Sequence, residues 1–184
     1  MGVFDENPAA AADLPVPWQE TVAYFQGSFS RYSPTVKDGT TEGALLWGQW
    51  NDNKEKKCQP GESPIDCELR VHRPVIVFVH VGTHWEARNR RYLEIILNKI
   101  LDHGAVPVLV TKADNRELDE RVNQNYAALA AEYGVPLWNF WLSVQNLPNH
   151  GLEPDSDMYL SQAGLEVHRM GALQVLDAVW RAVR

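Results

Sequence analysis

RPVIVFVHVGTHWE, residues 73–86, is the stretch of sequence that decides the fold. Val75 to Val79 form an unbroken, largely β-branched apolar run, which is typical of a strand buried on both faces of a parallel sheet. Polar and aromatic residues begin directly after Gly82. In open α/β sheets, ligands bind at the carboxyl ends of the strands. The stretch therefore predicts a central strand with a ligand site just beyond it.

The chain after this strand alternates between helical and strand patterns. A stripe of apolar residues predicts a helix over 90–102, which Gly104 is placed to end. Residues 106–111 and 135–140 predict two further buried strands, and residues 115–133 predict an amphipathic helix between them. A serine-capped helix then runs through the last residues of the sequence. This order indicates an α/β fold, a three-layer sandwich with a central parallel sheet.

The residues before the strand carry weaker signals. Residues 1–17 are rich in alanine, proline and acidic residues and predict a flexible N-terminal arm, whereas residues 18–184 are expected to form a single domain. Pro17 is placed to begin a helix. Residues 44–50 predict another short helix, and the polar residues 27–43 predict a loop.

Composition and charge argue against several classes of partner. The formal net charge of −7 argues against a nucleic-acid partner, which would favour a basic face. No apolar run approaches the roughly 18 residues of a membrane span, so none is expected. Residues 1–13 lack both the basic and the apolar region of a signal peptide.

The two cysteines, Cys58 and Cys67, flank a loop rich in turn-forming residues. Such a loop can bring the sulfur atoms within bonding distance, which predicts a disulfide. The alternative is two unrelated thiols in a reducing cytosol. A disulfide would imply an extracellular or exported protein.

Several segments follow one another in an order that resembles a known family. They are Gly82-Thr83, HGAVPVLVTKADN (103–115), YGVPLWNFW (133–141), and LPNHGL (147–152) with Leu160-Ser161 after it. Over roughly residues 18–184, the chain resembles the C-terminal two-thirds of the SGNH (GDSL-type) hydrolases, particularly a bacterial branch with a cysteine-containing loop. The resemblance implies an esterase-type hydrolase that acts on a carbohydrate or lipid ester, with a small-molecule or glycan ester as ligand and no cofactor.

The resemblance also implies where the catalytic groups should lie. A Gly-Asp-Ser turn supplies the nucleophile, a glycine and an asparagine supply oxyanion donors, and an Asp-x-x-His segment supplies the base. Gly-Asp-Ser occurs nowhere in this chain, and the preceding strand is also missing, so we expect a sheet without its first strand. Gly39 matches the oxyanion glycine, and Gly82-Thr83 match the third block.

The remaining family positions are altered, so a standard triad cannot be assembled. His84 stands at the asparagine position, Trp85 replaces an aspartate, and Tyr159 stands where the base histidine belongs. His84 can still donate a ring N–H to an oxyanion. A tyrosine hydroxyl, with an unperturbed pKa of about 10, is a poor general base at neutral pH. His150 would supply a base from another loop, or simply bond its own turn, and Asp157 completes the candidate catalytic residues.

A metal site is the second chemistry that the sequence offers. His80, His84 and Glu86 would share one face of an extended strand, with Asp157 or His150 nearby as further ligands. The glycine turn after the strand breaks that alternation, so no metal is expected.

The tryptophans divide into two groups. Trp85, Trp138 and Trp141 lie at or beyond strand ends, where they line a groove for a sugar or an acyl chain or pack the core. The others are interpreted as core or helix-packing residues: Trp18, Trp47, Trp50 and Trp180.

Two functions stay open at this point. The first is an ester hydrolase with an unorthodox site, and the second is a non-catalytic or truncated domain that binds a ligand such as a glycan. A sheet without its first strand would expose an apolar edge, so self-association is possible.

Overall fold

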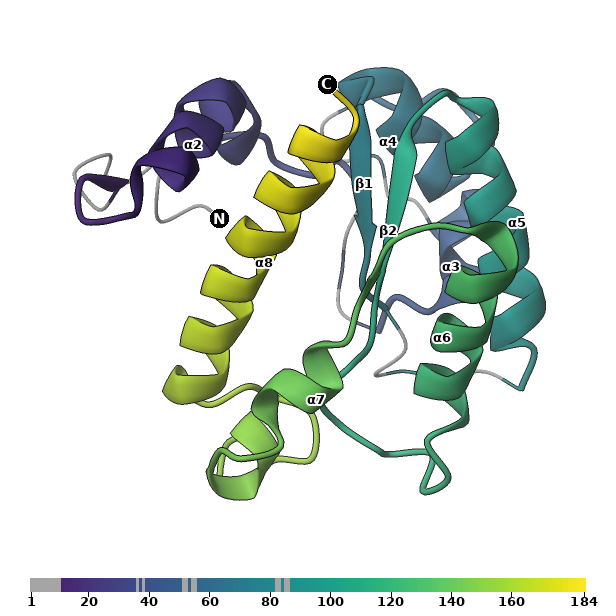
Figure 1. The fold of residues 1–184 in the computed structure, drawn as a ribbon. Helices are drawn as coiled ribbons and strands as arrows, with labels where there is room; N and C mark the ends of the chain where they lie inside the picture. The colour runs from purple at the N-terminus through teal and green to yellow at the C-terminus, as the bar shows by residue number, and fades with distance from the viewer. Residues whose placement is uncertain are drawn as a thin grey trace.

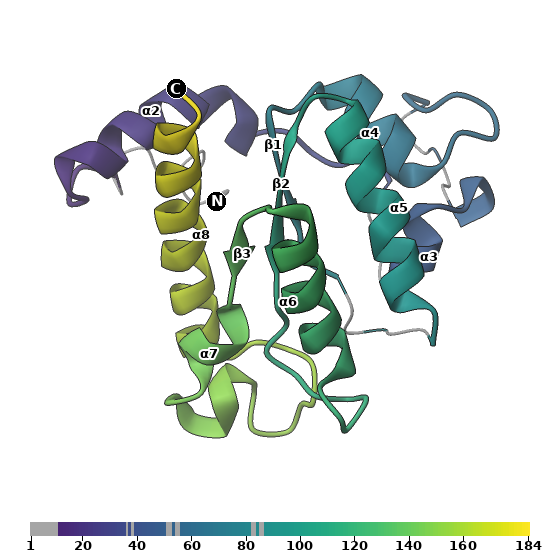
Figure 2. The same cartoon turned by 45° about the vertical axis from the view of Figure 1, so that its right-hand side comes forward.

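The computed structural model describes residues 11–35, 37, 39–50, 53, 56–81, 84 and 87–184. Within them, three parallel strands pair in sequence order: β1 (Ile76–Val79), β2 (Val106–Val110) and β3 (Leu137–Trp138). Helices cover both faces of this sheet (Figure 1, Figure 2). The predicted three-layer α/β sandwich is therefore confirmed.

β1 lies at the edge of the described sheet, although the sequence predicts a central strand. The middle strand is β2, in which Val108 lies beside Phe78 of β1 and Leu109 lies beside Leu137 of β3. Among the described residues, no strand pairs with the other side of β1. An apolar run indicates that both faces of a strand are covered by helices, but it does not indicate how many strands pair with it within the sheet. That is why the position of β1 was predicted wrongly.

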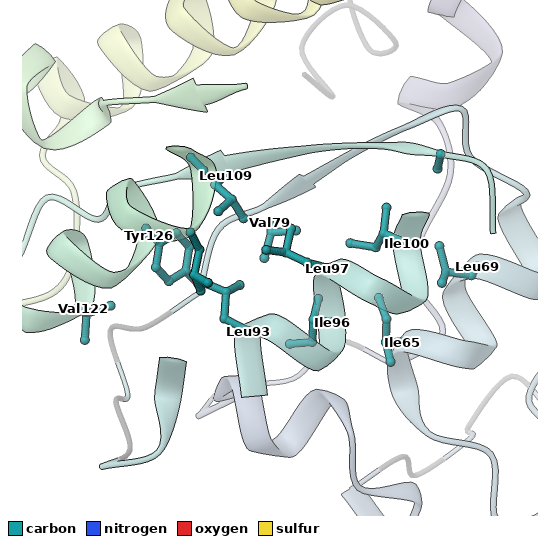
Figure 3. Packing of buried hydrophobic residues seen from close by; sticks show 13 residues of the cluster. Ile65, Leu69, Val79, Leu93, Ile96, Leu97, Ile100, Leu109, Val122 and Tyr126 are labelled. Atoms are coloured by element: carbon teal, nitrogen blue, oxygen red, sulfur yellow. The ribbon is translucent and has the colours of Figure 1, made fainter. Parts of the chain in front are cut away.

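One face of the sheet is covered by α3 (Glu42–Leu45), α4 (Pro64–His72), α5 (Asn89–Asp102) and α6 (Arg121–Tyr133) (Figure 2). The apolar stripe of α5 points into the core between these helices and the sheet (Figure 3). Burying each large aliphatic side chain contributes about 1.5–3 kcal/mol to folding. The members with no exposed surface are Leu93, Ile96, Leu97, Ile100, Leu109, Tyr126 and Leu129.

The other face is covered by α7 (Phe140–Val144) and by the long α8 (Gln162–Ala182). Ser161 caps α8 as predicted, because its hydroxyl accepts a hydrogen bond of 3.2 Å from the Gly164 N–H. Trp138 of β3 packs against this helix, and its ring leaves no room for a side chain at Gly171.

The N-terminal helix α2 (Val16–Phe29) lies on the outer side of α8 (Figure 1). Phe25 packs against Leu176 and Trp180, and Val22 packs against Leu173. Residues 1–10 of the expected arm lie outside the described residues, and α2 begins at Val16 rather than at Pro17.

The helix predicted over residues 115–133 starts only at Arg121. Residues 115–120 form a loop instead, in which Leu118 and Glu120 adopt left-handed backbone conformations with φ of 68° and 55°. The loop is held because the carboxylate of Glu117 turns inward to a buried lysine. The spacing of apolar residues favours a helix from residue 115, but the buried ion pair of Glu117 with Lys112 keeps residues 115–120 in a loop.

The remaining short elements differ in length from the predicted ones. The helix expected over residues 44–50 is divided into α3 and a 3-10 turn, η2 (Gly48–Trp50), and the third strand is shorter than residues 135–140. A second 3-10 segment, η3 (Pro148–Gly151), lies in the loop before α8. The disulfide between Cys58 and Cys67 is confirmed.

Candidate functional site

The carboxyl ends of β1 and β2 open onto a small pocket with a volume of about 170 Å³. It lies where parallel α/β sheets bind ligands. We call it the strand-end pocket, and its walls are His80, Lys112, Ala113, Asp114, Phe140, Met158 and Leu160.

Two of the pocket walls, Lys112 and Asp114, belong to a buried ion trio that Glu117 completes. The side chains of Lys112, Asp114 and Glu117 are at most 3% exposed. The Lys112 ammonium donates hydrogen bonds of 2.5 Å to Asp114 Oδ1 and to Glu117 Oε2. The amide of Asn123 holds the Lys112 peptide by bonding both its N–H and its carbonyl. A buried ammonium needs such partners, because its desolvation would otherwise be uncompensated.

Another wall residue, His80, is paired with His168, a contact that the sequence did not predict. Nδ1 of His80, directly after β1, lies 3.1 Å from Nε2 of His168 on α8, and the two rings are stacked. Both rings contact the edge or face of Phe140. Close packing of protein around both imidazoles lowers their pKa, and the charge of His168 lowers the pKa of His80 further. The residue His80 is nevertheless exposed to solvent, so its pKa is lowered less than full burial would lower it.

Two of the predicted catalytic residues, His84 and His150, lie on the surface away from the strand-end pocket. His84 is exposed, and its ring forms no hydrogen bond with a described residue. His150 is also exposed, has a φ of 52°, and places Nδ1 3.3 Å from the Gln145 carbonyl oxygen. It bonds the backbone of its own turn, which is the alternative that the sequence left open.

Tyr159 and Asp157 lie in the loop that precedes α8. Tyr159 is 60% exposed, and its backbone N–H donates to the Ser156 hydroxyl. The Asp157 carboxylate accepts a hydrogen bond of 3.2 Å from Nε of Arg116. Neither residue lines the strand-end pocket. The neighbouring Met158 does, so this loop contributes an apolar wall to the pocket.

Of the predicted oxyanion and pocket residues, the structure describes only Gly39. Gly39 lines a different hollow beside η2. Gly82, Thr83 and Trp85 lie outside the described residues. No hydrogen bond or ion pair joins any two of the predicted site residues that the structure describes.

The roles predicted for the tryptophans are only partly confirmed. Trp138 is buried against Phe140 and His168 and therefore serves packing. Trp180 is a core residue, as predicted. Trp47 is 54% exposed, so its interpretation as a packing residue was wrong.

Within the part of the chain that the structure describes, no hydrogen bond joins a histidine to a serine, threonine or cysteine. The group of three possible metal ligands found among these residues is Cys58, Glu62 and Cys67, and its two sulfur atoms are bonded to each other. None of the described helices has the length and apolar content required to cross a membrane.

No protein-family model matches the chain, and no curated protein matches it. Its structure is similar to that of a GDSL-like lipase from Bacteroides thetaiotaomicron, with a TM-score of 0.57 and 14% sequence identity. The similarity covers 97% of this chain and 98% of the lipase chain. The chain has a GDSL-like hydrolase fold. At this sequence identity the similarity establishes the fold alone.

Proposed function

We propose that the chain is a non-catalytic ligand-binding domain on a GDSL-like hydrolase fold, with the strand-end pocket as its binding site. The observation that carries the proposal is the content of that pocket. Among the residues that the structure describes, its walls contain no hydroxyl, and its histidine is hydrogen-bonded to a second histidine. Acyl transfer to a side chain requires a nucleophile within hydrogen-bond reach of a base, and the described wall residues do not provide that pair.

The walls also indicate what kind of group binds there. The Lys112 ammonium already donates to two carboxylates, so it has little to offer an anion. Phe140, Met158 and Leu160 provide an apolar lining. Nε2 of His80 forms no hydrogen bond with a described residue and can bond one polar atom. We infer a small neutral group that carries a single hydroxyl or carbonyl, such as one hydroxymethyl group at the end of a glycan.

The alternative is hydrolysis of a carbohydrate or lipid ester, and the fold likeness to a GDSL-like lipase favours it. This function needs an unorthodox arrangement of Gly39, His84, His150 and Tyr159. Three of these residues are surface side chains, so binding would have to draw them together. Losing the nucleophile and the base together removes the interactions on which acyl transfer depends.

One experiment separates the two functions. The 184-residue chain is incubated with a fluorophosphonate and measured by intact mass, and its turnover of p-nitrophenyl acetate is assayed in parallel. No adduct and no turnover is the expected result. A stoichiometric adduct on one serine, lost in His84→Ala or His150→Ala, establishes a hydrolase and overturns the proposal.

Binding is tested separately by ligand-observed NMR with a library of small neutral alcohols, amides and sugars. We expect hits that disappear in His80→Ala and persist in His103→Ala, which removes an exposed histidine at the end of α5. Binding in the strand-end pocket is contradicted if no compound of the library binds, or if the compounds that bind still do so in His80→Ala.

A further inference from the structure

A second hollow, beside α3 and η2, has strongly aromatic walls. Its volume is about 490 Å³, and it shares no residue with the strand-end pocket. We call it the aromatic groove, and the walls that matter here are Gly39, Thr41, Trp47, Trp50 and Tyr92. Residues 39–50 supply one side of the groove, and α5 supplies Tyr92 on the other.

Trp47 presents its indole to solvent while its backbone is fixed. The residue is 54% exposed. Its N–H donates 3.2 Å to the Ala44 carbonyl, and its own carbonyl accepts a 2.9 Å bond from the Trp50 N–H. A large aromatic surface left in water is unfavourable for folding, and apolar patches rimmed by polar groups often mark binding sites. The turn thus fixes the backbone that carries the ring before any ligand arrives, which lowers part of the entropic cost of binding.

Trp50 is anchored by polar contacts at its edge and over its ring. Its indole N–H donates a 3.2 Å hydrogen bond to the Thr40 hydroxyl. The Lys37 ammonium lies 4.2 Å from the ring centroid, within cation–π range. Gly39 adopts a φ of 78°, and a Cβ there would lie 3.9 Å from the Trp50 ring. Glycine therefore permits the left-handed backbone of this turn and places no side chain next to the Trp50 indole.

We propose that the aromatic groove binds a pyranose ring of an oligosaccharide. A pyranose has a face of C–H groups, which packs on the electron-rich face of an indole, and a rim of hydroxyls. The Lys37 ammonium lies over the ring of the wall residue Trp50, and the wall residue Tyr92 carries a hydroxyl, so each offers a hydrogen-bonding group to that rim. The Tyr92 hydroxyl forms no hydrogen bond with a described residue. An acyl chain gains most in a closed apolar tunnel, whereas here Trp47 is open to water and Thr41 and Tyr92 add hydroxyl groups to the walls.

The test uses the 184-residue chain and isothermal titration with cellohexaose, chitohexaose, xylohexaose and mannohexaose. We expect at least one to bind, and binding to weaken about tenfold or more in Trp47→Ala, as for an aromatic anchor. Trp47→Phe should retain most of the affinity, because it keeps an aromatic face. Tyr32→Ala, which removes a tyrosine that is 75% exposed and does not line the groove, should leave binding unchanged.

The outcomes are decisive for this groove alone. Failure of all four oligosaccharides at about 10 mM, or equal binding by wild type and Trp47→Ala, overturns the proposal. Binding of decanoic acid that Trp47→Ala abolishes, without sugar binding, assigns an acyl chain instead. Trp47→Gln repeats the test if Trp47→Ala is unfolded by circular dichroism. His80→Ala should not affect sugar binding here, so failure at the strand-end pocket is distinguishable.

Discussion

The hydroxyl of Thr21 on α2 donates a hydrogen bond to the carboxylate of Asp177 on α8, across 156 positions of sequence. Both residues are buried. The Arg181 guanidinium donates to the same carboxylate at 2.8 Å and to the Pro17 carbonyl at 2.8 Å. A buried carboxylate requires its donors, because leaving it unsatisfied costs the full desolvation penalty. This network therefore fixes the position of α2 on α8.

Thr21→Val should destabilise the protein by about 1–3 kcal/mol, because the valine keeps the shape of threonine and removes the donor to Asp177. Urea unfolding followed by circular dichroism measures the change. Thr21→Ser retains the hydroxyl and should lose clearly less stability. Equal stabilities of Thr21→Val and wild type would show that Arg181 alone satisfies the carboxylate.

Lys112→Met should destabilise the protein by about 3–5 kcal/mol, because it leaves Asp114 and Glu117 as buried charges without their cation. The triple change Lys112→Met, Asp114→Asn and Glu117→Gln should recover part of that loss, since the uncompensated charge is gone. Guanidinium unfolding midpoints provide the comparison.

The matched control is Arg121→Met, which breaks a surface ion pair with Asp119 and should have no measurable effect. A small effect of Lys112→Met, similar to that of the control, would mean that the ion trio contributes nothing to stability.

Stability should fall as the pH drops from 6.5 toward 5. The folded state lowers the pKa of His80 and His168 below the ordinary value of 6.5, mainly through burial. Unfolded histidines therefore bind protons in this range while the folded pair does not, so acid favours unfolding and the histidine contribution is complete only above pH 6.5.

His80→Gln should flatten this pH dependence, because one of the two perturbed rings no longer titrates. Melting temperatures between pH 5 and pH 7 test the expectation, since most carboxylates stay ionised there. His103→Gln serves as the control for an exposed histidine. An unchanged slope in His80→Gln would show that the histidine pair does not set it.

Gly171→Ala and Gly27→Ala, both on long helices, should shift stability in opposite directions. A Cβ at Gly171 would lie 2.6 Å from the Trp138 ring, so the buried indole must move, at a cost of about 1–3 kcal/mol. Nothing lies within 4 Å of a Cβ at Gly27, so alanine should stabilise α2 by up to about 1 kcal/mol. Thermal unfolding compares the two variants, and loss of stability in both would contradict the packing explanation.

The sequence predicted the layers well, because strands covered on both faces and amphipathic helices have strong apolar periods. Two helix caps were also predicted correctly: Ser161 caps the start of α8, and Gly134 ends α6 with a left-handed φ of 63°. Such features depend on neighbours in sequence. The start of α6 was predicted wrongly, because it depends on a lysine that the chain buries against expectation.

The candidate sites were less predictable than the fold. His80 and His168 are 88 positions apart and belong to no motif, so only the packing of α8 against β1 brings them together. The exposure of Trp47 had no signal in the sequence either, because tryptophan is typical of both cores and binding surfaces. His84 and Tyr159, which were predicted from family positions, and His150, which was predicted from its place on a separate loop, lie on the surface.

The contact of α2 with α8 has a consequence for the order of folding. β1, α5, β2 and α6 follow one another along the chain and contact their sequence neighbours, so they can assemble with little loss of chain entropy. Docking α2 on α8 requires closing a loop that spans most of the protein, and that entropy must be lost before Thr21 reaches Asp177. We expect the helical layer on the α5 side to form first and the α2–α8 layer to close over the sheet last.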